Sequence, residues 1–280
     1  MNIIHKIRQY PIVFLFLAFL IGFAILDELW PKREYSELEN RKLAQRPTFT
    51  ISSVLEENPN NTWMSQYDKY TKDQVAFRDG WIDLKSRIEA LFLKTENNDV
   101  WLGQDHYLFA KFLSLGESTR FYQNLSAIEK LCERHPDMVD VMIVPSASLI
   151  LEDKLPYDAP VANEDLYLDE LAATLSGKAS VYDERETLRQ HQDEYIYYRT
   201  DHHWTDNGAY YAYQDYIEGQ GLTPVSHESL PLSTVDNFYG TNYSKARTFN
   251  AIPDTITYPD LNNILTIHNF DPLGNETLEP

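Results

Sequence analysis

The sequence predicts an α/β domain with a mainly parallel sheet and flanking helices, preceded by one membrane-spanning helix. Two observations predict this architecture. Beyond residue 117, short β-branched segments alternate with segments that have the apolar period of a helix. Close to the N-terminus, an uncharged apolar run is long enough to cross a bilayer. Glycine and proline residues separate these segments, as expected between the elements of a folded domain.

The apolar run occupies residues 10–26, which reaches the lower limit of about 17 residues for a membrane span. Lys6 and Arg8 precede the run, and Asp27 and Glu28 follow it. Basic residues before a span favour a cytoplasmic N-terminus and an exported remainder.

We therefore expect a cytoplasmic tail over residues 1–9, a transmembrane anchor over 10–28, a polar stalk over 29–62 and an extracytoplasmic domain over 63–280. The expected location is the cell membrane, with a single span and the bulk of the chain outside. A cleaved signal peptide is the alternative. The lack of a convincing small-x-small cleavage sequence near Ala24 favours the uncleaved anchor.

The elements of the exported part follow from periodicity. Apolar residues recur at helical spacing over residues 63–93, among them Trp81, Leu84, Ile88 and Leu91, and predict helix there. Two short apolar runs in residues 100–109 predict a hairpin.

An alternating series then follows along the chain. It comprises a helix over residues 117–134, a strand over 139–144, a helix over 164–176, a strand over 180–182, a helix over 184–192, a strand over 195–199 and a helix over 206–220. Thr205 is placed to cap the last of these helices, and Gly221 to end it. After Gly221 the sequence is interpreted as loop, without a closing strand or helix.

Composition excludes several classes of protein. The 280 residues carry a formal net charge of −19, which argues against nucleic acid as a partner because phosphates require a basic surface. The single cysteine, Cys132, excludes an internal disulfide and any multi-cysteine metal site, and its place on an apolar helix face predicts an inert core residue. Aromatic residues make up 13% of the chain, which excludes intrinsic disorder.

The densest polar cluster is TDHHWT (residues 200–205), which follows the last predicted strand. Ligands of open α/β sheets bind beyond the carboxyl ends of strands. A carboxylate two residues before a histidine can accept the proton on Nδ1 and leave Nε2 as a base, so Asp201 and His203 are candidate catalytic residues. His202 is expected to point elsewhere.

Two alternatives remain open for this cluster. Its side chains could simply cap the next helix. Asp-His-His is also a natural ligand set for a metal, as in DHH-type phosphoesterases, but the upstream Asp-x-Asp of those enzymes is missing here. We therefore assign no metal ligands.

The chain resembles the DHHW family of exported bacterial proteins, named for the tetrapeptide present here as residues 201–204. Further family-like segments are SELENRKLAQRP (36–47), DQVAFRDGW (73–81), VWLGQDHYL (100–108) and FYGTNYSKA (238–246). They run in order over roughly residues 30–250. The family in turn is similar to the SGNH-hydrolase-like domain of alginate O-acetylation enzymes, which share a Thr-Asp-x-His-Trp-Thr segment.

This resemblance implies an SGNH-hydrolase-like, flavodoxin-like fold and acyl transfer without a cofactor. In the relatives, a serine takes an acetyl group and passes it to a polysaccharide hydroxyl, often with a membrane-bound O-acyltransferase as acetyl source. Carried over, His203 is the base and Asp201 orients it. Trp204, Tyr239, Gly240 and Thr241 are assigned to substrate binding. From the residues themselves, the backbone N–H groups of Gly240 and Thr241 are candidate donors to an oxyanion, with a plain aromatic turn as the alternative. For Trp204, a packing role is the alternative.

The nucleophile is missing from this pattern. In the relatives, the serine lies in an Asp-Ser-like block well after the Asp-x-His segment, and no such block follows Trp204 here. We therefore expect that the C-terminal part of the domain is missing and that the serine lies beyond Pro280. Ser146, Ser148 and Ser244 are weak substitutes. A non-catalytic protein that binds glycan or docks an acyltransferase is the alternative function.

Overall fold

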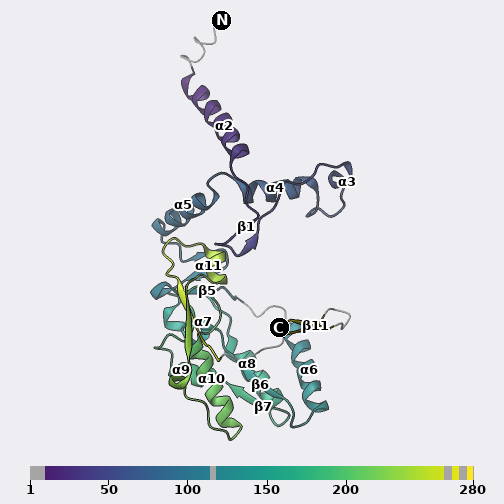
Figure 1. Ribbon diagram of the computed structural model, residues 1–280, viewed down its shortest axis with the longest axis vertical. Helices are drawn as coiled ribbons and strands as arrows, with labels where there is room; N and C mark the ends of the chain where they lie inside the picture. The colour runs from purple at the N-terminus through teal and green to yellow at the C-terminus, as the bar shows by residue number, and fades with distance from the viewer. Residues whose placement is uncertain (1–9, 114–117, 262–266, 271–275, 280) are drawn as a thin grey trace. The chain divides into compact units, whose positions relative to one another are not determined.

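The computed structural model describes residues 10–113, 118–261, 267–270 and 276–279 (Figure 1). The expected cytoplasmic tail, residues 1–9, lies outside the described residues. The chain forms two compact units. Unit 1 comprises residues 1–98 and 243–251, and unit 2 comprises residues 99–242 and 252–280.

Unit 1 begins with helix α2 (Pro11–Leu29), which covers the apolar run. Pro11 stands in the first turn, where its missing N–H is not needed and its fixed φ suits a helix. By length and composition α2 can cross a membrane, a property that it shares with signal sequences. The apolar helix predicted at this place is therefore present.

The segment expected to be a polar stalk contains short elements. Strands β1 (Tyr35–Ser36) and β2 (Arg41–Lys42) form an antiparallel pair, and α3 (Ile51–Val54) follows. Charge holds the strand pair to the next helices, because Arg41 donates to Asp73 at 2.6 and 2.9 Å and Arg78 donates to Glu39 at 2.8 Å.

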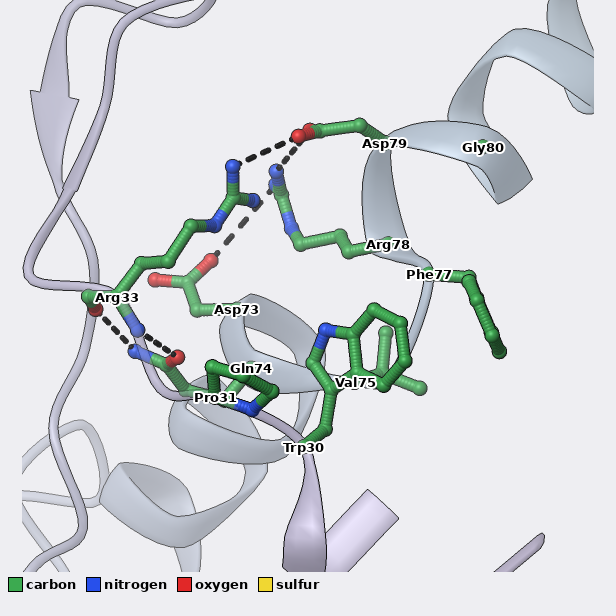
Figure 2. Close-up of a pocket in the computed structure, with 10 residues that line it drawn as sticks. All are labelled: Trp30, Pro31, Arg33, Asp73, Gln74, Val75, Phe77, Arg78, Asp79 and Gly80. Carbon is green, nitrogen blue, oxygen red and sulfur yellow. Dashed lines mark hydrogen bonds and ion pairs between the residues drawn. The ribbon is translucent and has the colours of Figure 1, made fainter. Parts of the chain in front are cut away.

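The helical region predicted over residues 63–93 is confirmed as two helices, α4 (Trp63–Gln74) and α5 (Arg78–Leu91). Phe77, in the left-handed conformation at φ 60°, separates them. Strand β3 (Glu96–Asn97) follows. A pocket of about 330 Å³ lies between the end of α2 and the turn from α4 to α5, lined among others by Trp30, Arg33 and Arg78 (Figure 2).

Unit 2 contains most of the predicted elements close to their predicted bounds. The hairpin is β4 (Val100–Leu102) and β5 (Leu108–Ala110). The helices are α6 (Ser118–Arg134), α7 (Ala147–Ile150), α8 (Glu164–Leu175), α9 (Arg185–Gln190) and α10 (Asp206–Gly219), and the strands between them are β6 (Asp140–Ile143) and β7 (Ser180–Asp183). Short 3₁₀ turns lie at Gln104–His106, Glu152–Lys154 and His227–Ser229.

The predicted mainly parallel sheet is not seen among the described residues. β6 and β7 form a parallel pair, from Asp140 opposite Ser180 to Ile143 opposite Asp183, but their sheet has only two strands. The pairs β1–β2, β4–β5, β8–β9 and β10–β11 are antiparallel. The fold class is thus mixed α/β.

The prediction of a strand over residues 195–199 was wrong. The segment has bends at residues 195 and 199, and the one bridge recorded for it among the described residues is antiparallel, between Tyr197 and Trp204. That bridge consists of the bonds from Thr205 N to Ile196 O and from Tyr198 N to His203 O, and beyond it Arg199 N donates to the carboxylate of Asp254. The cluster at 200–205 therefore closes a tight turn and does not end a sheet strand.

The interpretation of the chain after Gly221 as loop was also wrong. This region contains β8 (Leu232–Phe238), α11 (Thr241–Ala246), β9 (Asp254–Pro259), β10 (Ile267–Phe270) and β11 (Glu276–Glu279). β8 and β9 pair from Leu232 opposite Pro259 to Phe238 opposite Asp254, with a bulge on the way. Most residues of β8 are exposed, so the strand has no buried face. Its sequence therefore lacks the alternation of apolar and polar residues by which a half-buried strand is predicted.

Two apolar clusters form the core of unit 2. The larger cluster gathers Trp101, Phe109, Leu151, Leu188 and Tyr197 from five parts of the chain. The smaller cluster, Leu125, Cys132 and Leu175, joins α6 to α8 beneath the parallel pair. Cys132 is buried there, as predicted.

Candidate active site

The Asp-His-His-Trp segment lies at the tip of a tight, hairpin-like turn. Tyr198 N donates to His203 O at 3.2 Å, and Thr205 N donates to Ile196 O at 2.9 Å. Trp204 is half-buried and packs against the larger core cluster. The turn thus rests on the core through Trp204 and presents the residues before it, which agrees with the packing role considered for Trp204.

Helix α10 fixes the far side of this turn. Thr205 caps the helix as predicted, because its hydroxyl accepts from Gly208 N at 3.4 Å while donating to Tyr195 O at 2.6 Å. A Cβ on Gly208 would stand 2.5 Å from Ile196 O, so glycine is needed where the helix begins this close to the turn.

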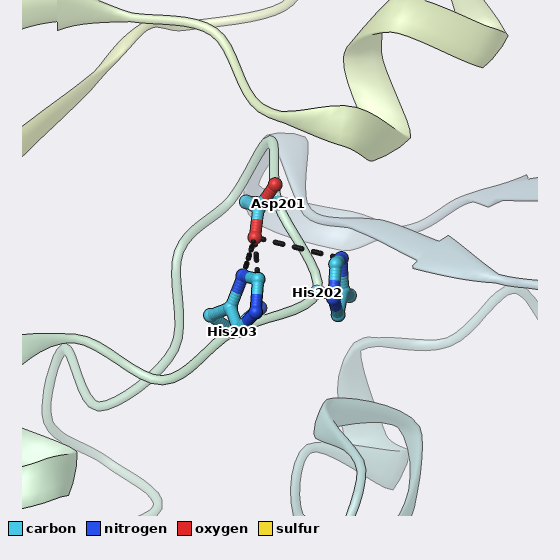
Figure 3. A group of neighbouring side chains, drawn as sticks. All are labelled: Asp201, His202 and His203. Carbon is cyan, nitrogen blue, oxygen red and sulfur yellow. Dashed lines mark hydrogen bonds and ion pairs between the residues drawn. The ribbon is translucent and has the colours of Figure 1, made fainter. Parts of the chain in front are cut away.

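Asp201 and His203 form the hydrogen-bonded pair that the spacing predicts (Figure 3). Asp201 is 3% exposed, and its Oδ1 accepts from His203 Nδ1 at 2.5 Å and from His203 N at 3.0 Å. The His203 side chain is 65% exposed. Because Nδ1 donates to the carboxylate, Nε2 is the basic nitrogen and lies toward solvent.

The other oxygen of Asp201 is held by Thr241. Thr241 N donates to Asp201 Oδ2 at 2.7 Å, and Thr241 Oγ1 donates to it at 3.0 Å. Burial disfavours the charged carboxylate, but the hydrogen bonds from Thr241 and His203 outweigh burial and hold the pKa of Asp201 below its ordinary value. Asp201 is therefore a stable anion at neutral pH.

His202 reaches the same carboxylate through Thr241. His202 Nδ1 lies 2.8 Å from Thr241 Oγ1 and 3.6 Å from Asp201 Oδ1. Since the Thr241 hydroxyl has one proton, which it donates to Asp201, the consistent tautomer of His202 donates from Nδ1 to Thr241. The sequence predicted that His202 points away from the pair. In the structure it instead supports Asp201 through Thr241.

A second buried carboxylate, Asp254, supports the turn from behind. It is 1% exposed, and its oxygens accept from Arg199 N at 2.9 Å, Thr200 N at 2.8 Å and Thr200 Oγ1 at 2.5 Å, and also from the Tyr195 hydroxyl. These bonds fix the backbone immediately before Asp201. Sequence analysis missed Asp254, because its partners lie more than 50 residues away in the chain.

Gly240 lets a second segment approach the pair. Its N–H donates to Thr200 Oγ1 at 3.0 Å. A Cβ at this position would stand 2.3 Å from Asp201 Cβ and 2.4 Å from Asp201 Oδ2. No side chain fits at such distances, so Gly240 is required by the close approach of the two segments.

The predicted oxyanion role of Gly240 and Thr241 was wrong. The N–H of Gly240 is bonded to Thr200, and the N–H of Thr241 is bonded to Asp201. Both groups therefore build the site and are not free for a ligand. Tyr239 precedes them and is half-buried.

The substitute serines are engaged elsewhere. Ser146 caps α7, and its hydroxyl contacts Glu164 at 2.5 Å and Ser148 at 2.9 Å. Ser244 lies in α11. Within the described part of the chain, the side chains in hydrogen-bond or ring contact with the His203 imidazole are those of Asp201 and His202.

Asp201, His202 and His203 each place one potential ligand atom within 4.8 Å of the others. A cation would nonetheless have to compete with bonds already made. The four acceptor positions of Asp201 receive four donors, and both Nδ1 atoms are hydrogen-bonded. The arrangement fits a hydrogen-bonded acid–base pair better than a metal centre.

Comparison with known protein families shows to which family the chain belongs. A family profile described as "DHHW protein" matches residues 100–271. The match covers more than half of the chain, so the protein belongs to the DHHW family. A comparison with curated proteins found no match.

Several solved structures are similar to the chain. A DHHW family protein from Eubacterium siraeum is 26% identical with a TM-score of 0.49, over 62% of this chain and 57% of that one. The O-acetyltransferase domain of Pseudomonas putida AlgJ is 22% identical with a TM-score of 0.43, over 58% and 66%. Bacillus cereus PatB1 with a sulfonyl adduct is 18% identical with a TM-score of 0.48, over 66% and 65%. The chain thus spans little more than half of the DHHW structure.

Proposed function

We propose that this protein is an anchored, extracytoplasmic member of the DHHW family that transfers acyl groups to or from polysaccharide hydroxyls. The observation that carries the proposal is the pair formed by buried Asp201 and exposed His203, in which Nδ1 is fixed and Nε2 is accessible. General acid–base catalysis needs this combination of a held imidazole and an open nitrogen.

The chemistry assigned to the pair is proton transfer during acyl transfer. His203 Nε2 takes the proton of a serine hydroxyl as its oxygen attacks the acyl carbon, and later returns a proton to the departing oxygen. Asp201 remains ionised and stabilises the imidazolium, which agrees with its lowered pKa. We assign the nucleophile to a serine of the native protein and name no residue for it.

The location and partners belong to the same proposal. We assign residues 1–9 to a cytoplasmic tail, 10–28 to the anchor, 29–62 to a membrane-proximal stalk and 63–280 to an SGNH-like domain outside the membrane. The acceptor is a cell-envelope polysaccharide, and a membrane-bound O-acyltransferase supplies the acetyl group. The reaction as assigned needs no cofactor.

The test is acetyl-ester turnover by the native protein in membranes of its source organism, with p-nitrophenyl acetate as substrate. His203→Ala should lower turnover at least about 100-fold, the lower range for a lost general base. The matched control is His227→Ala, because His227 also pairs with a carboxylate, that of Asp206 at 2.5 Å. Full turnover by His203→Ala would contradict the assigned role.

A second function is favoured by one observation, namely that, among the described residues, the His203 side chain is hydrogen-bonded to Asp201 and not to a serine. The protein would then bind glycan or dock an acyltransferase without chemistry of its own. Unchanged glycan binding by His203→Ala, together with no esterase activity in the native protein, would select this function.

A further inference from the structure

Helix α5 carries an apolar stripe that unit 1 leaves uncovered. The stripe consists of Phe77, Trp81, Leu84, Ile88 and Leu91, each between 44% and 81% exposed. Intervals of three and four residues place Trp81, Leu84, Ile88 and Leu91 on one face of the helix, and Phe77 is the left-handed residue that precedes its first turn. Phe92 and Leu93 extend the stripe and are more than 80% exposed. Soluble monomers rarely leave a contiguous apolar surface of this kind in water.

The stripe begins where the proposed membrane span ends. Trp30 directly follows α2, and its ring lies 4.2 Å, centre to centre, from that of Phe77 (Figure 2). Ala76 N donates to Asp27 Oδ1 at 2.7 Å, and Trp81 Nε1 donates to Ala76 O at 2.9 Å. The start of α5 is therefore bound to the last turn of α2.

Basic side chains border the stripe. The helical repeat puts Lys85 on one side of it and Arg87 on the other. Their side chains are about half exposed. Each is paired with a carboxylate of the same helix, Lys85 with Glu89 at 3.6 Å and Arg87 with Asp83 at 2.9 Å, so these pairs add no net positive charge to the border. The long stems of such side chains cover apolar surface while their charged heads stay in water.

From these contacts we propose that α5 lies on the outer leaflet of the membrane, with the stripe from Phe77 to Leu91 inserted at the boundary between headgroups and acyl chains. The occupant of this surface is thus a lipid bilayer. The inference rests on the proposed anchoring by α2, since that anchor holds Phe77 and Trp81 at the level of the interface. Aromatic residues, tryptophan above all, favour that level.

The test places nitroxide labels on the full chain in vesicles of phosphatidylethanolamine and phosphatidylglycerol. Cys132→Ala removes the native thiol, and single cysteines are introduced by Ile88→Cys, Ala90→Cys and Ala18→Cys. Ile88 lies on the stripe, Ala90 is exposed on the opposite face of α5, and Ala18 is in the middle of α2. Collisions with oxygen, which concentrates in acyl chains, are compared with collisions with a water-soluble nickel chelate.

We expect the label at Ile88 to collide several-fold more with oxygen, relative to nickel, than the label at Ala90. The two faces of a helix differ in depth by about 10 Å, enough to separate lipid from water. Equal nickel access at Ile88 and Ala90, with Ala18 protected, would overturn the proposal for α5 and leave the anchor intact. Nickel access at Ala18 would overturn both. Spin–spin broadening between Ile88 labels would instead identify a second copy of the chain as the occupant and also overturn it.

Discussion

Asp254 provides the sharpest test of how the site is held together. Its buried carboxylate accepts two hydrogen bonds on each oxygen. Oδ1 receives the Tyr195 hydroxyl and Arg199 N, and Oδ2 receives the N–H and hydroxyl of Thr200. We consider two changes, Asp254→Ala and Asp254→Asn.

The expected cost follows from which donors can find another partner. The hydroxyls of Tyr195 and Thr200 can rotate, but the backbone N–H groups cannot. The Thr200 N–H is buried, and a buried donor without an acceptor costs about 1–3 kcal/mol. Arg199 N is partly buried and adds to this, so Asp254→Ala should lower the free energy of unfolding by at least about 2 kcal/mol.

Asp254→Asn should cost less. If its amide NH₂ takes the place of Oδ1, the Tyr195 oxygen can accept from it and both Thr200 bonds remain. Only the bond from Arg199 N is then lost, for about 1 kcal/mol. The matched control is Asp236→Asn, because Asp236 on β8 is exposed and accepts one hydroxyl, that of Thr255. Its expected effect is within about 0.5 kcal/mol.

The assay is urea unfolding of the detergent-solubilised full chain, followed by tryptophan fluorescence, with hydrogen exchange of residues 196–204 as a local measure. With an m-value of about 2 kcal/mol per molar urea, Asp254→Ala should shift the midpoint by about 1 M. The same variant should speed exchange at Thr200. A midpoint and exchange rate equal to those of Asp236→Asn would refute the supporting role of Asp254.

Four other results are expected. Burial disfavours the ionised form of Asp201 but its hydrogen bonds outweigh this and lower its pKa, so its stabilisation is complete above about pH 4 and lost as the pH falls through the lowered value; Asp201→Asn should flatten this acid limb in urea titrations. Burial raises the pKa of Glu184 to about 7, and its carboxylate oxygens have no hydrogen-bond partner among the described residues. The protein therefore loses stability as the pH rises from about 4.5 to about 7, and the loss stays constant above that range. Glu184→Gln should be up to about 3 kcal/mol more stable than the native chain at pH 8 and equally stable at pH 4, as urea unfolding at the two pH values would show. Gly240→Ala should destabilise the fold by about 1–3 kcal/mol and displace Asp201, whereas Gly80→Ala, with open space around its Cβ, should not, as thermal unfolding would show. Cys132 should react with a maleimide only after denaturation, and fast labelling of the native chain would contradict its burial.

The parts of the fold that sequence predicts well are those with a strong local signal. Helix α10 has both of its signals nearby, the capping hydroxyl of Thr205 and Gly221 at φ 72°. The pair of Asp201 and His203 was predictable for the same reason, since two residues of spacing suffice to join a carboxylate to Nδ1.

The parts that sequence could not predict depend on contacts between distant segments. Nothing near Asp254 in the chain indicates that it receives the backbone of residues 199–200, and nothing near Gly240 indicates that it touches Asp201. The stripe on α5 was missed for another reason: an apolar face at helical spacing has the same pattern whether protein or something else covers it.

The hydroxyl of Thr200 ties three segments together, since it donates to Asp254 while accepting from the N–H of Gly240. In a chain leaving the ribosome, Thr200 and the Asp-His-His-Trp segment directly after it precede their supports, since Thr200 emerges 40 residues before Gly240 and 54 residues before Asp254. During that interval the turn has its sequence but not its supports. Assembly of the site is therefore a late event in synthesis. A shortened chain ending before Asp254 would keep the Asp-His-His-Trp segment but lack the Asp254 carboxylate that holds the backbone of residues 199–200 in place.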